Sequence, residues 1–236
     1  MAVVLRTLRS RIHEDRDRFH LVLMLALTFS TGIADAVGYL GLDRVFTGNM
    51  TGNVVILGMA LAGGDDLPVA GPLLALGTFM AGAALGGIVL RPTEAGWSGR
   101  TSAMFGAVGL LMVAITVLLV LFGDDLPHAV QLTVTGLLAL AMGLQAATAR
   151  HLAVKDVTTV VVTSTITGLA ADSRLAGGTG KNAGRRMAAI GLICAGAAVG
   201  ALLLQAHLAW GVALSALISL AVTALGHPTA DPRPRP

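Results

Sequence analysis

Charged and aromatic residues are scarce in this sequence. Of its 236 residues only 12% are charged and 4% are aromatic, whereas 55% are hydrophobic. An ordinary soluble domain carries about 25% charged residues. Several charge-free runs reach about 20 residues, which is the length needed to cross the hydrocarbon core of a bilayer. The composition therefore predicts an integral membrane protein.

The near absence of cysteine removes further classes of protein. The single Cys194 excludes an internal disulfide and any metal cluster built on cysteine. The histidines are scattered near the ends of apolar runs, no nucleophile–base pair stands out, and the glycine-rich stretch 177–182 lacks the preceding strand of a phosphate loop. We therefore expect no metal, no cofactor and no enzymatic activity. The net charge of +3 does not indicate nucleic acid, because basic residues in membrane proteins set orientation.

The apolar runs divide the chain into long and short segments. Two short ones, 49–63 and 157–171, would each span about 22 Å as a helix, less than the roughly 30 Å core. A tail at 1–19 precedes a single membrane domain, 20–226, and a tail at 227–236, predicted to be disordered, follows it. The sequence predicts an all-α integral membrane fold of about six transmembrane helices plus two short interrupted or re-entrant elements. The predicted spans are 20–42, 69–90, 101–122, 129–149 and 187–226, the last divided into two near 205–211.

An internal repeat relates the two parts of the membrane domain. Segment 77–86 matches segment 191–200 at six of ten positions, at an offset of 114 residues, and both contain a Gly-x-x-x-Gly face that allows close helix packing. At an offset of 111, Gly32 aligns with Gly143, and Thr51 aligns with Thr163 one residue further on. The repeats are about 20–122 and 129–226, each with the order span, short element, span, span.

The distribution of charge favours one topology. If each short element enters and leaves on the same side, the acidic turns at 65–66 and 124–125 lie outside. The basic segments 91–100, 150–155 and 174–186 then lie inside with both termini, which agrees with the positive-inside rule, and only Arg44 lies on the other side. Three crossings then separate each span from its counterpart, so the halves are inverted. If the short elements crossed fully, the halves would be parallel and Arg91 and Arg100 would lie outside.

The two short elements carry most of the polar groups. Polar, glycine-broken backbone survives at membrane depth only where protein or a water-filled cavity surrounds it. Stretch 46–53 (FTGNMTGN) and stretch 158–168 are rich in side chains that cap helices. A half-helix that begins inside the membrane directs unpaired N–H groups toward the midplane. We predict that the two elements face each other around a small polar or anionic solute. Which end of each lies deepest stays open, and residues 160–162 also fit a strand.

Individual side chains within this region are candidates for solute contact. Asp35 is the one acid within a predicted span, where a charge costs several kcal/mol. Asp35 is therefore either a functional residue, for example one that couples transport to protons, or a structural one. A structural Asp35 would bond to Asn or Thr side chains or lie near a helix end. Gln145 either contacts the solute or bridges two helices. The candidate substrate-binding residues are Asp35, Asn49, Thr51, Asn53, Gln145, Thr163 and Thr165.

Several motifs together resemble a known family. They are Gly32-x-x-Asp35-Ala36, the stretch 46–53, the segment 143–147 and the threonines at 158–167. These are similar to the YoaK-like family of small bacterial inner-membrane proteins, a domain of unknown function, over about residues 20–225. The resemblance implies a membrane architecture and a bacterial inner-membrane location but no substrate. Members of the family carry Asn after Gly-Leu-Gln, where this chain has Ala146.

The first functional hypothesis is a small secondary transporter or channel-like permease that works by alternating access. A homodimer packed on the Gly-x-x-x-Gly faces would supply a scaffold. The alternative is a non-transporting membrane protein that partners another complex, and it predicts polar motifs that contact each other without a cavity. An intramembrane enzyme lacks a supporting constellation of residues. We expect a multi-pass protein of the bacterial inner membrane, in contact with the lipid bilayer, with both termini cytoplasmic.

Overall fold

The computed structural model describes residues 2–64, 66–123, 125–153 and 162–230. Six helices are long and apolar enough to cross a membrane, two shorter apolar helices accompany them, and the described residues contain no strand. The predicted all-helical fold with six long and two short elements is therefore confirmed. The helices are α1 (Ala2–Gly41), α2 (Met50–Leu61), α3 (Ala70–Leu90), α4 (Gly99–Phe122), α5 (His128–Leu152), α6 (Val162–Ala171), α7 (Ala183–Leu204) and α8 (Leu208–Gly226).

The boundaries differ from the sequence prediction at both ends of the chain. The segment 1–19, which the sequence analysis separates from the first span as a tail, forms one continuous helix with that span from Ala2 onward. At the other end, residues His227–Thr229 form a 3₁₀ turn. Arg16 donates to the carbonyl oxygen of Thr229, and Nε2 of His20 lies 2.9 Å from its Oγ1. The two terminal segments therefore meet at one end of the bundle.

The long apolar segment 187–226 divides where the sequence analysis placed the break. Helix α7 ends at Leu204, and α8 begins at Leu208. His207 caps the second helix, since its Nδ1 accepts from the N–H of Ala209 at 3.0 Å. Residues 154–161, which include the predicted polar positions 155, 156, 158 and 159, lie outside the described residues, as do residues 65 and 124 of the acidic turns.

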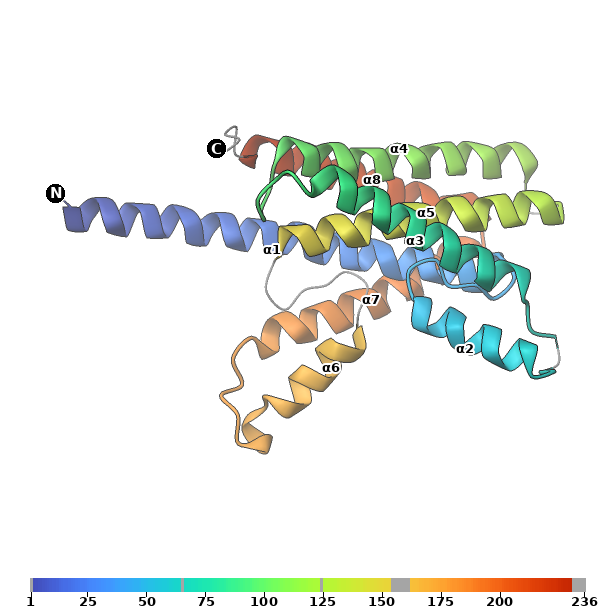
Figure 1. Cartoon of the computed structure of the whole chain (residues 1–236), viewed down its shortest axis with the longest axis horizontal. Coiled ribbons are helices and arrows are strands. Elements are labelled where there is room, and N and C mark those ends of the chain that lie inside the picture. The colour runs from blue at the N-terminus through green and yellow to red at the C-terminus, as the bar shows by residue number, and fades with distance from the viewer. Residues whose placement is uncertain (1, 65, 124, 154–161, 231–236) are drawn as a thin grey trace.

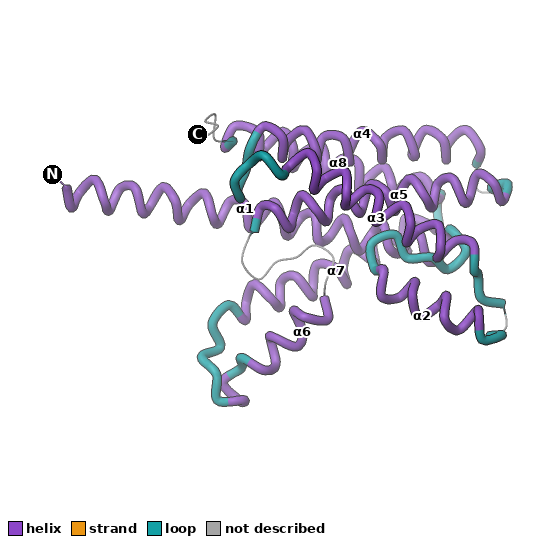
Figure 2. Tube along the Cα trace, in the orientation of Figure 1, coloured by secondary structure: helices purple, strands orange, loops and turns teal. Residues whose placement is uncertain are grey.

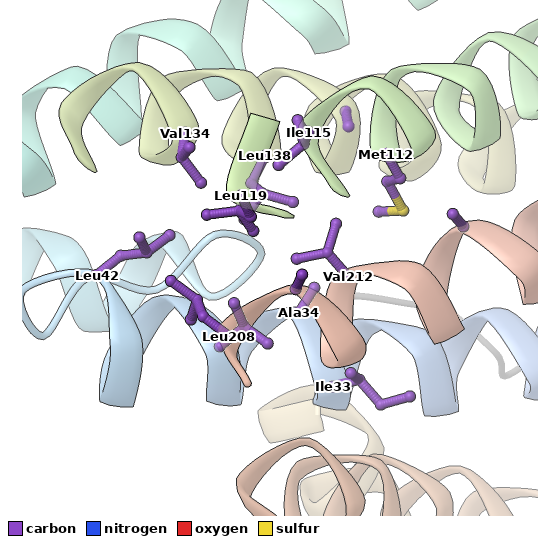
Figure 3. Packing of buried hydrophobic residues seen from close by; sticks show 14 of the residues in the cluster. Ile33, Ala34, Leu42, Met112, Ile115, Leu119, Val134, Leu138, Leu208 and Val212 are labelled. Atoms are coloured by element: carbon purple, nitrogen blue, oxygen red, sulfur yellow. The ribbon is translucent and has the colours of Figure 1, made fainter. Parts of the chain in front are cut away.

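The main hydrophobic core lies between α1, α4, α5 and α8. Helices α4, α5 and α8 each contribute four buried residues and α1 contributes three, because apolar residues recur along one face at helical spacing, and Leu42 is added by the turn after α1. Figure 3 shows the α4 and α5 side chains meeting those of α1 and α8. The buried members are Ile33, Ala34, Val37 and Leu42; Val108, Met112, Ile115 and Leu119; Val134, Leu138, Ala141 and Met142; and Leu208, Ala209, Val212 and Ala216.

Helices α3 and α7 pack against this core through glycines. A Cβ on Gly82 would collide with the carbonyl oxygen of Leu140, and a Cβ on Gly196 would collide with that of Phe29. Such close approach of helix backbones requires residues without side chains. Helix α3 therefore lies along α5, and α7 lies along α1, so the third helix of each repeat packs on the first helix of the other.

These glycine contacts match residue by residue at the offsets found in the sequence. Gly32 approaches Ile193, whereas its counterpart Gly143 approaches Phe79, the counterpart of Ile193. Gly86 and Gly200 likewise each meet an alanine, Ala147 and Ala36 respectively, that are counterparts at an offset of 111. The Gly-x-x-x-Gly faces are thus occupied inside the chain. The prediction that they pack two copies together is therefore replaced by packing between the two halves.

The helices alternate in direction. Helices α1, α4 and α7 run one way along the bundle and α3, α5 and α8 run the other way (Figure 1). The short helices lie together on one side of the bundle. Helix α2 begins midway along it and runs toward the end where α1 finishes, whereas α6 begins midway and runs toward the opposite end (Figures 1 and 2). We call the end at which α3 and α5 finish, with Arg91 and Arg150, the basic end.

Candidate functional site

A cavity of about 1030 Å³ lies between the beginnings of α2 and α6. Its walls come from six helices and the turn before α2, and it extends from the basic end of the bundle to Asp35. It is lined by Asp35, Gly48, Asn49, Met50, Thr51, Phe79, Ala83, Gly87, Leu90, Arg91, Ala95, Ala146, Ala147, Arg150, His151, Ala153, Val162, Thr163 and Ile193.

Asp35 organises the turn that leads into α2. Its Oδ1 accepts from the backbone N–H groups of Thr47 at 3.0 Å, Gly48 at 2.7 Å and Asn49 at 3.3 Å. Three successive N–H groups that converge on one oxygen form an anion-binding concavity, which a carboxylate fills well because its hydrogen bonds are charge-assisted. Within the part of the chain that the structure describes, Oδ2 has no hydrogen-bond partner. Asp35 therefore stabilises the loop and also lines the cavity.

Asn53 fixes the same loop from the other side. Its side chain is 0% exposed, its Oδ1 accepts from the N–H of Phe46 at 2.9 Å, and its Nδ2 donates to the Phe46 carbonyl oxygen at 2.6 Å. The Phe46 ring in turn stacks on Tyr39 at a centroid distance of 4.8 Å. Asn53 does not line the cavity, so the structure gives it a position that holds the wall.

The predicted residues at the start of each short helix do line the cavity. Asn49 is the N-cap of α2, and its Oδ1 accepts from the N–H of Gly52 at 3.3 Å. Thr51 is the second residue of α2, and Thr163 is the second residue of α6. Thr51 and Thr163, which are counterparts in the repeat, thus line the same cavity from two helices.

Gln145 and Thr165 are buried behind the cavity wall. Gln145 is 0% exposed, and its Nε2 donates to Oγ1 of Thr31 at 3.1 Å, which joins α5 to α1. Its Oε1 is buried without a hydrogen-bond partner among the described residues. Thr165 is 9% exposed and also lies outside the lining. Of the two options for Gln145, the geometry matches the bridge between helices.

Sequence reasoning missed the cationic part of the cavity. Arg91 follows the end of α3, and Arg150 and His151 lie in the last turn of α5, yet all three line the cavity. His151 Nε2 lies 3.0 Å from both Oγ1 of Thr93 and the carbonyl oxygen of Glu94, so it also holds the loop beside the opening. In the sequence these residues look like ordinary basic loop positions. The only available signal was that two of them end helices that pack together.

The described residues contain no group of three His, Cys, Asp or Glu side chains that could hold a metal ion. Cys194 is exposed and free on α7. The polar side chains at the cavity carry hydroxyls, an amide, one carboxylate, one imidazole and two guanidinium groups. They suit hydrogen bonding and charge recognition of a small molecule.

Six long apolar helices around one shared core define a multi-pass α-helical membrane protein. The chain belongs to the family described as "Protein of unknown function (DUF1275)", which it matches over residues 23–225. It is 31% identical over 152 residues to the UPF0700 transmembrane protein YoaK of Bacillus subtilis (strain 168). That match covers 64% of this chain and 65% of the relative, so the chain spans slightly less than two thirds of it. No solved structure matches the chain.

Proposed function

We propose that this chain is a small secondary transporter, or permease, for a small polar or anionic solute. The observation that carries the proposal is the cavity between the two short helices. It is large enough for a small metabolite with water, since ligand pockets commonly measure about 300–1,000 Å³. Asp35, Asn49, Thr51 and Thr163 would contact the solute. Asn53, Gln145 and Thr165 would hold these contact residues in place.

The architecture supports this proposal, because it has the features of an inverted-repeat transporter. Helix α1 runs opposite to its counterpart α5, and α3 runs opposite to α7 (Figure 1). A two-fold axis that relates such pairs is perpendicular to the helices and therefore lies in the membrane plane. In this arrangement α2 and α6 are re-entrant half-helices that enter from opposite faces. Transporters of this type bind their solute at mid-depth between interrupted helices.

The cavity straddles this proposed axis. Two pairs of counterpart residues line it, namely Thr51 with Thr163 and Phe79 with Ile193, and a third pair is formed by Asp35 and Ala146. Residues related by an axis in the membrane plane meet only where that axis passes, which is near the midplane. The deep part of the cavity is therefore proposed to lie at mid-depth in the bilayer.

The charges support an orientation with the basic end in the cytoplasm. Arg91, Arg100 and Arg150 lie at that end, where the terminal segments also meet. Arg44 lies at the other end, and its Nη1 donates to the carbonyl oxygen of Asp66 at 3.2 Å. The positive-inside rule then gives cytoplasmic termini in a bacterial cytoplasmic (inner) membrane. Because the cavity lining reaches the basic end, we assign the cavity to an inward-facing state of the proposed alternating-access cycle.

A non-transporting accessory role remains the second hypothesis. It predicts that the polar motifs bond to each other and leave no space. Asp35 and Asn53 do bond to the loop of their own half, whereas Thr51 and Thr163 face the cavity. The polar residues of the two halves thus support transport more than a purely structural role.

Uptake by proteoliposomes tests the transport proposal. The purified chain would be reconstituted and tested with small radiolabelled anions and neutral metabolites, and the double variant Thr51→Val/Thr163→Val would serve as the cavity variant. We expect uptake above empty liposomes for at least one solute and at least a tenfold loss in the variant, since about 1.4 kcal/mol of lost interaction gives tenfold. Thr133→Val is the matched control, because Thr133 lies on a part of α5 that does not line the cavity. Uptake of no solute, or equal uptake by both variants, would contradict the proposal.

A further inference from the structure

Two arginines at the opening of the cavity lack, among the described residues, the hydrogen-bond partners that three other arginines of the chain have. Arg44 and Arg100 donate to backbone carbonyl oxygens, and Arg186 pairs with Asp172 at 2.7 Å. In the part of the chain that the structure describes, the guanidinium groups of Arg91 and Arg150 have no hydrogen bond or ion pair. Both nevertheless line the cavity. A guanidinium group offers five donors in a planar fork that matches a carboxylate or a phosphate.

Negative charge along the cavity is limited. Asp35 is the one acid among the lining residues, and its Oδ1 is already occupied by the N–H groups of residues 47–49. Glu94 lies in the loop near the opening and is exposed, as Arg91 and Arg150 are, but it is not part of the lining. The two guanidinium groups therefore outnumber the single lining carboxylate, and the opening of the cavity carries net positive charge.

The positions that the internal repeat relates to these two arginines do not carry the same charge. At the offsets of 114 and 111 residues, the counterparts of Arg91 and Arg150 are Gln205 and Tyr39, and neither is cationic. Deeper in the cavity, the counterpart of Asp35 is Ala146, whose methyl group lines the wall. The first half therefore supplies its own carboxylate at this position, whereas the second half has space beside Arg150.

We infer that Arg91 and Arg150 bind the negatively charged group, a carboxylate or a phosphate, of the molecule that enters the cavity, and that Ala146 leaves the room for it. This inference rests on the proposed function, and it narrows the solute to an anion. The two arginines are the specificity residues, because a guanidinium group forms charge-assisted, bidentate hydrogen bonds with such groups. The same chemistry occurs in a soluble anion and in an anionic lipid headgroup, so the test separates these two sources.

Thiol labelling measures the charge in the cavity without knowledge of the solute. In a Cys194→Ala background, Ala146→Cys would place one thiol in the wall. Its rates of reaction would be measured with an anionic and a cationic methanethiosulfonate of similar size. We expect the anion-to-cation rate ratio to fall about tenfold in Arg91→Gln/Arg150→Gln, since removing two nearby positive charges changes a local potential by this order. In Arg174→Gln/Lys181→Gln, which removes two positive charges outside the cavity, the ratio is expected to stay within about twofold.

A second set of measurements identifies the occupant. The same thiol would be labelled in nanodiscs of phosphatidylcholine, with or without phosphatidylglycerol, and with inorganic phosphate or acetate at constant ionic strength. Labelling that becomes slower when phosphate or acetate is added supports a soluble anion. Labelling that becomes slower only when phosphatidylglycerol is present supports a lipid headgroup. No slowing by either would overturn the assignment of a binding site.

The failures of the two proposals give different results. A rate ratio that is the same in Arg91→Gln/Arg150→Gln and in the parent overturns the role of the arginines, while a reactive thiol and measurable uptake leave the transport proposal intact. A thiol at position 146 that reacts with neither reagent shows that the cavity is closed to solution. That result would contradict both the transporter and its anion selectivity.

Discussion

The two halves of this protein share one helical plan but differ in polar residues at their short helices. In the first half, Asp35 accepts three backbone N–H groups before α2, and Asn53 bonds to both backbone polar groups of Phe46. In the second half, the aligned residues are Ala146 and Thr165. Neither can supply a carboxylate or an amide. The start of α2 is therefore fixed by two groups that have no equivalent at the aligned positions of the second half.

This difference shows how an internal repeat can keep its packing and change its chemistry. The contacts that hold the halves together, glycine against backbone, are the same in both. The polar groups that face the cavity are not. In the transporter that we propose, a symmetric scaffold would allow two related conformations, and an asymmetric set of charges would favour one class of solute. Substitutions at four places would break or sharpen this comparison.

Removal of the Asp35 carboxylate is expected to have the largest effect. Asp35→Ala leaves three N–H groups without their acceptor, which we expect to lower the free energy of unfolding by about 3 kcal/mol. For a chain of this size the Tm would fall by about 6–12 °C. Thermal unfolding in detergent measures the change. Asp35→Asn keeps an acceptor oxygen and should lose less than half as much, and the exposed Asp17→Ala serves as control. A Tm equal to that of the parent would show that the loop does not depend on this carboxylate.

The same Asp35→Asn variant tests the proton-coupling hypothesis. If Asp35 carries a coupled proton, the variant will lose the dependence of uptake on the pH gradient. If every flux and its pH dependence stay unchanged, Asp35 has only the structural role that its hydrogen bonds describe.

The second prediction concerns what the halves share. Gly82→Ala and Gly196→Ala each place a methyl group against a backbone carbonyl of the neighbouring helix, so we expect each to cost about 2 kcal/mol of stability. Because the two contacts are counterparts, the two losses should agree within about 0.5 kcal/mol. Gly77→Ala and Gly191→Ala, which have nothing within 4 Å, are the matched controls and should be neutral or slightly stabilising. A large loss in only one half would show that the repeat packing is not equivalent.

The third prediction makes the second half resemble the first. Ala146→Asp introduces a carboxylate into the cavity beside Arg150, which should repel anions and compete for the guanidinium group. We expect uptake of an anionic solute to fall about tenfold, equivalent to about 1.4 kcal/mol. Ala146→Asn has a similar size without the charge, and it should retain most of the uptake. Equal uptake by the two variants would mean that charge at this position is irrelevant.

The smallest effect is expected for Gln145. Gln145→Leu removes the hydrogen bond to Thr31 but also removes a buried Oε1 that has no partner among the described residues. These two changes oppose each other, so the stability should change by less than about 1 kcal/mol. Thermal unfolding measures it, with Thr31→Val as the complementary variant. A loss above about 2 kcal/mol would indicate that Gln145 has a further partner.

Several structural features were accessible from sequence alone. The lengths of the apolar runs predicted six spans and two short elements, and the break near 205–211 lies between α7 and α8 as expected. These signals are local, because each residue of a span must tolerate lipid and the rise per residue fixes how many are needed. The repeated glycines were also visible, but their partners were not. We predicted contact with a second copy, and the structure shows Gly82 and Gly196 against the other half of the same chain.

The candidate site was only partly predictable. Asn49, Thr51 and Thr163 stand in an unusual polar context within an apolar chain, and that context identified them. Arg91 and Arg150 stand in basic loops, as in any membrane protein, so no local pattern distinguished them.

The sequence by itself determined that this chain spans a membrane, how many helices it has and where polar backbone interrupts them, because hydropathy and helix length act residue by residue. Only the tertiary structure decided that α3 lies on α5 and α7 on α1, and that this crossing brings Arg91, Arg150 and Asp35 to one cavity. The physical reason is that close packing between residues more than 50 positions apart depends on the shapes of both surfaces, and the sequence of one surface does not specify which other surface it will contact.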